Sequence, residues 1–372
     1  MTSPAAADRL LGTLDLRATL DQRGFDVELQ VRPGEVVAML GANGAGKSTL
    51  LSLIAGLIRP DAGRITLDET VLVDVERRVW VPAHHRGVVL LAQQALLLPH
   101  MTAVANVAFG PRSQGRSRKD AKALAMRWLA AVDATELAQR RPAQLSGGQA
   151  QRIAVARALA AEPTLLLLDE PMAALDVAVA PALRQLLRKV LRDTRRTALL
   201  VTHDLIDALS LADRVIVLDA GRIVEDGPTR TVLTQPRSAF AARIAGVNLL
   251  AGTADTHAVL TPDRASIYGI LDPTCTIGEP AVAVFSPSAV AVHLTEPTGS
   301  PRNHLDATVT ELEPRGELIR VHAASSSTTG TTSDLIADIT AAAAADLELV
   351  PGKHVHFAIK ATEVQIYPSG QM

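Results

Sequence analysis

The chain has 372 residues, of which 48% are hydrophobic and 20% charged, as is typical of a folded protein with more than one domain. A formal net charge of −2 excludes a whole-chain electrostatic attraction to nucleic acid or to an anionic membrane surface. The single cysteine, Cys275, excludes an internal disulfide, and every apolar run is far shorter than the ~20 residues of a transmembrane helix. Residues 1–14 lack the basic patch and apolar block of a signal peptide. If the protein serves a membrane, we expect it to do so as a peripheral partner.

Residues 14–235 alternate between short apolar runs and helical patterns. The apolar runs predict strands that helices bury on both faces: 35–40, 88–92, 164–168, 198–201 and 215–218. The helical patterns occur at 47–58, 118–131, 148–161 and 182–191. This alternation predicts a parallel α/β domain.

The pattern changes after residue 248, where runs of alternating polar and apolar residues predict half-buried strands. These runs lie at 281–285, 305–309, 355–359 and 364–366. A predicted helix at 238–244 connects the two regions, and the Ser/Thr/Gly-rich residues 324–333 predict a flexible loop. We therefore expect one domain at 1–245 and a small all-β domain at 246–372.

A glycine-rich segment lies between the strand predicted at 35–40 and the helix predicted at 47–58. Glycines let the backbone curl so that its N–H groups face the β- and γ-phosphates, and the following helix directs its dipole at the same charge. Lys47 supplies a cation, and Ser48 supplies a hydroxyl ligand for Mg²⁺. The predicted nucleotide-binding residues are Gly41, Ala42, Asn43, Gly44, Ala45, Gly46, Lys47, Ser48 and Thr49.

Two carboxylates, Asp169 and Glu170, follow the apolar run at 164–168. Ligands bind at the C-terminal ends of strands in open parallel sheets. Asp169 is predicted to hold Mg²⁺, directly or through water, and Glu170 to polarise the attacking water. Alone, such a pair is more often a helix cap, but its occurrence together with the phosphate loop favours catalysis.

The pentapeptide Leu-Ser-Gly-Gly-Gln at 145–149 precedes the helix predicted at 148–161. With the phosphate loop and the acidic pair, it resembles the signature of ABC transporter ATPase subunits over residues 14–245. The resemblance implies a P-loop NTPase α/β domain with an inserted helical subdomain, and a head-to-tail homodimer that binds two ATP. A hydroxyl and glycine amides at a helix N-terminus form a second anion site, which would close over the partner's ATP. The residues involved are Ser146, Gly147, Gly148 and Gln149.

Other motifs of this family occur in the same order. The resemblance implies that Gln93 senses the γ-phosphate and Mg²⁺, and that His203 contacts the γ-phosphate. It also implies that Asp176 belongs to a loop that crosses the dimer interface, although Ala173 stands where a serine is usual, which removes one hydroxyl. The family stacks an aromatic ring on adenine. Phe25 is the local candidate for this role, with core packing as the alternative.

Two stretches narrow the resemblance to importers. Residues 97–102, with Asn106 and Phe109, resemble importers of oxyanions, iron, sugars and polyamines, in which this stretch forms part of the groove for the permease's coupling helix. Residues 71–74 and Arg86 look most like those of molybdate importers.

Residues 300–303, 337–340, 351–353 and 360–364 of the second domain resemble parts of molybdate-binding β-barrels of the OB-like type. This resemblance implies an oxyanion site in which hydroxyls, amides and cations lie at strand ends. The candidate residues are Ser300, Arg302, Asn303, Lys360 and Thr362. Alternatively, the first two are ordinary turn residues, Lys360 is a solvated strand residue, and the barrel only dimerises.

Together these patterns predict the ATPase subunit of an importer, most similar to those for molybdate, that uses ATP and Mg²⁺. As a homodimer, it would drive an integral membrane permease from the cytoplasmic face of the membrane, with an extracytoplasmic solute-binding protein acting indirectly. The alternatives within the class are importers of sulfate or thiosulfate, iron, polyamines or sugars. Two alternatives lie outside this class. A soluble ABC ATPase acting on nucleic acid or ribosomes is disfavoured by the near-neutral net charge and the single nucleotide-binding domain. An oxyanion storage or sensing protein is disfavoured by the complete set of hydrolytic motifs.

Overall fold

The computed structural model describes residues 12–176, 178–325 and 334–369. The chain forms two compact units, Met1–Thr229 and Arg230–Met372. Helix α8 (Ala239–Ala245) falls in the second unit, whereas the sequence placed residues up to 245 in the first domain. The physical reason is that α8 packs against β12 (Asn248–Ala254) of the second unit. Over the described residues, no helix is both long enough and apolar enough to cross a bilayer.

A six-stranded, mostly parallel sheet lies at the centre of the first unit, in the order β11-β10-β3-β9-β8-β7. Its strands are β3 (Val36–Leu40), β7 (Val88–Leu91), β8 (Leu165–Asp169), β9 (Thr197–Val201), β10 (Arg214–Asp219) and β11 (Arg222–Pro228). Every residue of β3 and β9 is buried, as expected for strands covered on both faces. The five predicted strands are confirmed to within a residue or two.

The first unit has a second, antiparallel sheet, in the order β2-β1-β4-β5-β6. In the chain, β1 and β2 come before the nucleotide loop, and β4, β5 and β6 come after it. Its strands are β1 (Leu14–Leu20), β2 (Phe25–Val31), β4 (Ala62–Leu67), β5 (Thr70–Asp74) and β6 (Val79–Trp80). This sheet is not among the predicted elements, although β2 alternates strictly between buried and exposed residues. That alternation is the pattern of a sheet with one face on the core.

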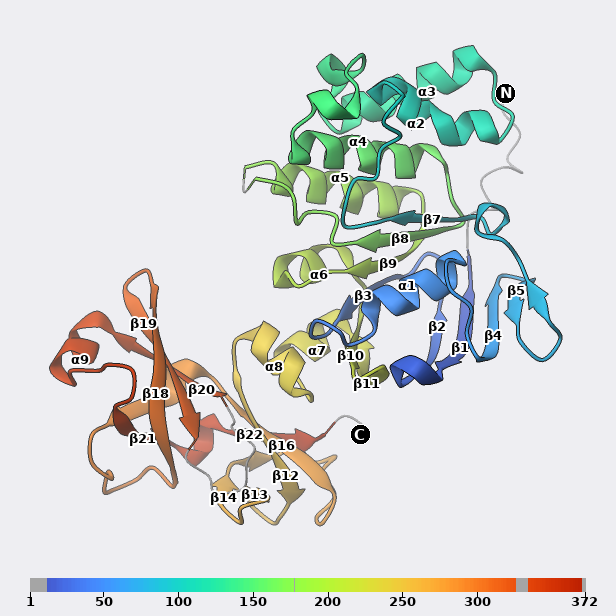
Figure 1. The fold of residues 1–372 in the computed structure, drawn as a ribbon. Helices are drawn as coiled ribbons and strands as arrows, with labels where there is room; N and C mark the ends of the chain where they lie inside the picture. The colour runs from blue at the N-terminus through green and yellow to red at the C-terminus, as the bar shows by residue number, and fades with distance from the viewer. Residues whose placement is uncertain (1–11, 177, 326–333, 370–372) are drawn as a thin grey trace. The chain divides into compact units, whose positions relative to one another are not determined.

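The helices of the first unit are α1 (Lys47–Ala55), α2 (Ala103–Ser113), α3 (Arg118–Ala131), α4 (Gly147–Ala160), α5 (Ala180–Asp193) and α6 (Leu205–Leu211). Helices α2, α3 and α4 pack on one another, and Figure 1 shows them grouped away from the antiparallel sheet. They enter the chain between β7 and β8, which confirms the inserted helical subdomain.

Helix α1 ends three residues earlier than the periodicity predicts. Gly56 takes a left-handed conformation with φ of 79°, and Arg86 Nη1 donates to the carbonyl oxygens of Leu53 and Ile54 at 2.9 and 3.0 Å. Burial lowers the pKa of Arg86 to about 10. A Cβ on Gly56 would lie 2.4 Å from Arg86 Nε, so a glycine is required where the guanidinium caps the helix.

The second unit is built from two sheets that share one apolar core. The first has the order β14-β13-β12-β16-β22-β15, with β13 (Ala258–Leu260), β14 (Ser266–Tyr268), β15 (Ile270–Leu271), β16 (Pro280–Phe285) and β22 (Gln365–Pro368). The second has the order β17-β21-β18-β19-β20, with β17 (Val290–His293), β18 (Asn303–Arg315), β19 (Leu318–Ser325), β20 (Asp334–Thr340) and β21 (His354–Ile359). The expected β-domain is confirmed.

Two helices and one strand boundary in and next to the second unit differ from the sequence expectation. A short helix, α9 (Ala341–Asp346), interrupts the all-β pattern, and Thr340 caps it by accepting a hydrogen bond from Ala343 N at 3.2 Å. Helix α7 (Thr229–Thr234) lies where the two units meet in the chain. Strand β19 includes the first two residues of the predicted loop, and the rest of that loop, 326–333, lies outside the described residues.

Candidate active site

Three glycines shape the loop between β3 and α1. Gly41, Gly44 and Gly46 have φ of 152°, 83° and 107°, which L side chains rarely adopt. A Cβ on Gly41 would lie 2.4 Å from the carbonyl oxygen of Leu218 in β10, so the loop can follow that strand only because Gly41 has no side chain. The loop leads into α1 at Lys47. Its backbone N–H groups and the helix dipole therefore favour a phosphate.

The ammonium group of Lys47 lies at this loop. Lys47 Nζ donates to the carbonyl oxygens of Gly41 at 2.7 Å and Ala42 at 2.8 Å. Burial lowers the pKa of Lys47, whereas the negative charges of Glu170 and Asp169 raise it. The predicted cation of the nucleotide site thus lies within electrostatic reach of the predicted acidic pair.

The remaining polar side chains of the loop differ in exposure. Asn43 and Ser48 are exposed, and Thr49 is buried. Thr49 Oγ1 accepts a hydrogen bond at 2.8 Å from Nη1 of Arg23, which ends a short 3₁₀ helix between β1 and β2. Ser48 therefore presents its hydroxyl to solvent, whereas the Thr49 hydroxyl is already engaged. Sequence reasoning missed Arg23, because nothing in its local pattern points to the phosphate loop.

Phe25, the candidate for adenine stacking, is only 2% exposed. It belongs to the apolar core of the first unit, and a Cβ added to Gly46 would lie 3.1 Å from its ring. A ring so deeply buried supports the phosphate loop from the core side. This placement favours the core-packing alternative for Phe25.

Three predicted catalytic side chains converge at one edge of the parallel sheet. Glu170 Oε2 accepts a hydrogen bond from Gln93 Nε2 at 3.1 Å, and Glu170 Oε1 lies 3.2 Å from His203 Nδ1. Gln93 follows β7, Glu170 follows β8 and His203 follows β9, and these strands are neighbours. Parallel strands end at the same edge of a sheet, so the fold brings the three side chains together.

Asp169, the last residue of β8, is suited to binding a cation. Burial raises the pKa of Asp169, the charge of Glu170 raises it further, and Lys47 lowers it. An added cation would offset both the burial and the neighbouring negative charge. The carboxylate of Asp169, the exposed hydroxyl of Ser48 and the amide oxygen of Gln93 are the hard oxygen ligands that Mg²⁺ prefers. The residues present therefore fit Mg²⁺ bound together with phosphate.

The signature pentapeptide forms the N-terminus of α4. Ser146 Oγ accepts from Gln149 N at 3.3 Å, and Gln149 Oε1 accepts from Ser146 N at 3.1 Å, which is a capping box. A Cβ on Gly147 would meet nothing within 4 Å, whereas one on Gly148 would lie 3.3 Å from the Ala174 carbonyl oxygen. Among the described residues, no hydrogen bond joins this segment to the phosphate loop. Within one chain the signature segment is thus not hydrogen-bonded to the phosphate loop, although its helix reaches the segment after Glu170 through Gln151 Nε2, which donates to the Pro171 carbonyl oxygen at 3.3 Å.

The predicted interface loop connects the acidic pair to α5. Ala173 N donates to the carbonyl oxygen of Glu170 at 3.1 Å, and the carbonyl oxygen of Asp176 accepts from Val179 N and Ala180 N at 2.9 and 3.1 Å. The loop is thus fastened to the catalytic segment at one end and to α5 at the other. Any movement of Asp176 would act on both.

A hollow of about 290 Å³ borders the segment expected to receive a permease. Leu98, Phe109 and Arg157 are among its lining residues, and Phe109 is 46% exposed despite its size. Arg157 of α4 donates from Nη1 to the carbonyl oxygen of Leu96 at 2.9 Å, in the segment that follows Gln93. Sequence reasoning did not assign this arginine a role, yet it links the signature helix to the Gln93 segment.

In the second unit, two of the candidate oxyanion residues lie beyond the end of one strand pair. The first residue of β18 pairs with the last residue of β21, so Arg302 and Lys360 are the residues directly beyond the last paired position. Both side chains are exposed, as are those of Ser300 and Thr362 in the adjoining turns. Two exposed cationic residues therefore follow the end of the β18–β21 pairing.

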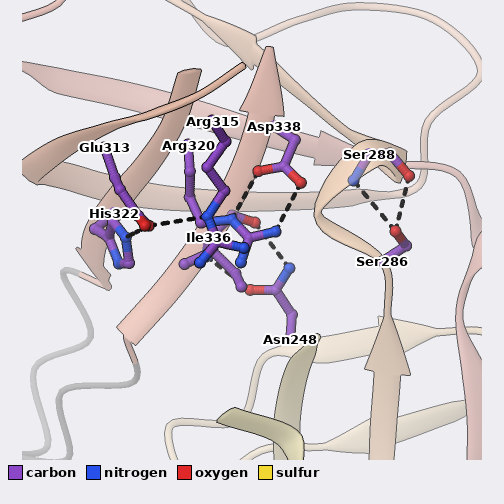
Figure 2. A network of polar contacts seen from close by, with 9 residues as sticks. All are labelled: Asn248, Ser286, Ser288, Glu313, Arg315, Arg320, His322, Ile336 and Asp338. Carbon is purple, nitrogen blue, oxygen red and sulfur yellow. Dashed lines mark hydrogen bonds and ion pairs between the residues drawn. The ribbon is translucent and has the colours of Figure 1, made fainter. Parts of the chain in front are cut away.

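Asn303 and Arg320 are engaged in the fold of the second unit. The Asn303 amide donates to Tyr268 O at 2.9 Å and accepts from Tyr268 N at 2.7 Å, which fastens β18 to β14. Figure 2 shows the guanidinium of Arg320 facing the carboxylate of Asp338, with two hydrogen bonds of 2.8 Å. This pairing raises the pKa of Arg320 and lowers the pKa of Asp338. The Asn303 amide is thus already bonded to Tyr268, and the Arg320 charge is balanced within the chain.

Comparison with known proteins matches both units to families. Residues 25–173 match the model described as ABC transporter, and residues 299–366 match the TOBE domain. The chain is 50% identical over 366 residues to the molybdenum import ATP-binding protein ModC of Mycobacterium tuberculosis (strain H37Rv), which covers 96% of this chain and 98% of that protein.

Two further comparisons cover shorter parts of the chain. It is 41% identical over 272 residues to the sulfate/thiosulfate import ATP-binding protein CysA 1 of Chromobacterium violaceum. That match covers 72% of this chain and 74% of the other protein. A solved dimeric ATP-binding cassette in a post-hydrolysis state with ADP and Pi superposes with a TM-score of 0.52 at 30% identity, covering 58% of this chain and 99% of the other.

Proposed function

Since the chain belongs to the ABC transporter ATP-binding family, we propose that it is the ATP-hydrolysing subunit of a molybdate importer. The observation that best supports ATP hydrolysis is that Gln93 and His203 both contact the Glu170 carboxylate. The likeness to the M. tuberculosis molybdenum import protein supports the substrate, because it spans 98% of that protein, whereas the sulfate relative matches 74% of its length.

Binding of ATP uses the loop between β3 and α1. The β- and γ-phosphates accept from its backbone N–H groups, and the Lys47 ammonium turns from the carbonyls of Gly41 and Ala42 to the phosphate oxygens. Ser48, Asp169 and Gln93 would hold Mg²⁺, which supplies charge neutralisation at the phosphates. Little covalent chemistry is required of the protein, so its contribution is positioning and electrostatics.

Glu170 polarises the water that attacks the γ-phosphorus. The oxygen–phosphorus bond to the leaving ADP breaks as the new bond forms, and the water proton passes towards the Glu170 carboxylate. Gln93 holds one oxygen of that carboxylate and His203 lies beside the other. The three residues therefore fix both the base and the direction from which water approaches.

A second copy of the chain completes the site. Each signature helix would place Ser146 and its glycine amides on the γ-phosphate bound by the other copy, because among the described residues these groups make no hydrogen bond to the phosphate loop of their own chain. The dimeric cassette with ADP and Pi, to which this chain is similar, supports the arrangement. Closure and reopening of such a dimer would drive a membrane permease, seated at the hollow that Phe109 and Leu98 line, from the cytoplasmic face of the membrane. An extracytoplasmic solute-binding protein would act indirectly.

Dimerisation should depend on ATP and on the signature serine. In a Glu170→Gln chain, MgATP should shift monomer to dimer in light scattering, or close the dimer if the second units already pair it. Adding Ser146→Glu should keep the dimer open, because a bulky negative side chain is placed against the γ-phosphate. A spin label at Lys122→Cys, in a chain with Cys275→Ala, would report closure as a shorter distance between copies.

Ser117→Glu is the matched control for this experiment. Ser117 is the N-cap of α3 as Ser146 is of α4, so both changes lose a cap, but only Ser146 belongs to the signature. The Ser117→Glu protein should close normally. Unchanged closure of the Ser146→Glu protein with ATP would contradict a shared nucleotide site.

We further propose that the second unit binds the transported oxyanion near Arg302 and Lys360. The support is the pair of exposed cations directly beyond the end of the β18–β21 pairing, with the hydroxyls of Ser300 and Thr362 in the adjoining turns. A tetrahedral dianion is favoured by such a set of donors and charges. Binding would regulate the ATPase only if one arrangement of the dimer binds the anion more tightly than the other.

Calorimetry on the full-length chain tests this site. With ADP present to occupy the phosphate loop, molybdate and tungstate should bind, and Arg302→Gln with Lys360→Gln should weaken binding about tenfold or more because two charged donors are lost. Arg264→Gln removes another exposed cation of the same unit and should leave binding unchanged. Absence of binding to the unaltered chain at millimolar molybdate would leave the second unit as a dimerisation module.

A further inference from the structure

The backbone on both sides of His203 is held by a set of buried or half-buried polar side chains. Thr202 Oγ1 donates to Asp207 Oδ2 at 3.1 Å and accepts from Asp204 N at 3.0 Å. Asp204 in turn caps α6 by accepting from Ile206 N at 2.7 Å. The His203 side chain itself is 70% exposed, so its position depends on these neighbours in the chain.

One residue from another element holds both carboxylates of this set. Arg184 Nε donates to Asp207 Oδ1 at 2.6 Å, and Arg184 Nη2 donates to Asp204 Oδ2 at 3.4 Å. The Arg184 side chain is 15% exposed and the Asp207 side chain only 4%. A buried carboxylate that loses its cation is left with an uncompensated charge, so this contact strongly constrains where Asp207 lies.

Arg184 also connects two functional segments. It lies in α5, which begins directly after the interface loop that contains Asp176. Together with Glu170, His203 and Ala173 it lines a hollow of about 410 Å³ next to the catalytic cluster. A shift of the interface loop would therefore be carried by α5 to the segment that holds His203.

We propose that Arg184 is a positioning residue for hydrolysis, which holds His203 beside Glu170 through Asp207 and Asp204. It acts through His203 and does not touch ATP. Without the guanidinium, Asp207 loses its cationic partner, the Thr202 hydroxyl loses a fixed acceptor, and the 3.2 Å approach of His203 Nδ1 to Glu170 is no longer enforced. The inference rests on the proposed hydrolysis at Glu170, and the rival explanation is that Arg184 only stabilises the packing of α5 on α6.

The test is a double-mutant cycle between Arg184 and His203. Arg184→Met is measured in the unaltered chain and in a His203→Ala chain, by kcat and KM for ATP and by single-turnover rates where hydrolysis is slow. Arg188→Met is the matched control, because Arg188 is one turn further along α5 and exposed. Thermal melting of each variant is recorded alongside. Failure of the unaltered chain to hydrolyse ATP would count against the proposed function and not against Arg184 in particular.

Arg184→Met should lower kcat about tenfold or more with KM changed by less than about twofold, and in the His203→Ala chain it should change the residual rate by less than about twofold. Arg188→Met should behave like the parent. An equal loss in both backgrounds, an unchanged kcat, or a loss of kcat accompanied by an equal rise in KM would overturn the proposal.

If the methionine variant does not fold, Arg184→Lys takes its place. Lysine keeps a charge beside Asp207 but lacks the rigid fork that reaches both carboxylates. A loss of kcat of about threefold or more that disappears in the His203→Ala chain is expected. A parental kcat for Arg184→Lys would also overturn the proposal.

Discussion

The Glu170→Gln protein should hydrolyse ATP at least about 10²-fold more slowly than the parent while binding ATP as tightly. Glutamine keeps the shape of the side chain and can still hydrogen-bond to Gln93 and His203. It removes the negative charge that polarises water, so the loss should appear in kcat and not in nucleotide affinity. Steady-state phosphate release and equilibrium binding of a fluorescent ATP analogue measure the two effects separately.

Glu28→Gln is a suitable control for this change. Glu28 is an exposed carboxylate on β2 of the same unit, so its loss changes the net charge equally without touching the site. Its rate should equal that of the parent. A Glu170→Gln protein that hydrolyses ATP near the parental rate would show that another group activates the water.

The sequence predicts the acidic pair at the end of an apolar run, and the resemblance to ABC transporter ATPases supplies Gln93 and His203. Gln93, Glu170 and His203 are far apart in the chain, but each follows one of three neighbouring parallel strands of the central sheet. Strand order and a common edge are enough to bring such residues together. The predicted phosphate loop likewise follows a strand, β3, and leads into a helix, α1.

The arginines that connect elements could not be predicted in this way. Arg184, Arg157 and Arg23 each bond to a residue on a different element, and the partner depends on how helices and loops pack. A helical pattern shows that Arg184 lies on α5 but not which carboxylate it faces. A motif can be found in a sequence when its residues have a fixed spacing, and the residues joined by these long-range contacts have no fixed spacing.

Two misjudged features of the fold have local causes. Strands β1 and β2 alternate with period two, but they lie outside the βα repeat on which the prediction was based. Helix α9 is an alanine-rich turn between β20 and β21, too short to show helical periodicity. The burial of Phe25 was open in the sequence because an aromatic residue at the start of a strand can point either way.

The most direct test of the account is molybdate uptake by cells that lack this chain. Molybdenum accumulated from submicromolar molybdate should fall to the background level on deletion, because the permease loses its ATP-hydrolysing subunit. The parental chain should restore uptake, and the Glu170→Gln chain, which binds ATP but cannot turn over, should not. Uptake of sulfate, iron and spermidine should be unaffected.

The same cells distinguish the alternative substrates. The account predicts that deletion abolishes molybdate uptake alone and that only a hydrolysing chain restores it. Unchanged molybdate uptake, with loss of sulfate, iron or polyamine uptake instead, would contradict it.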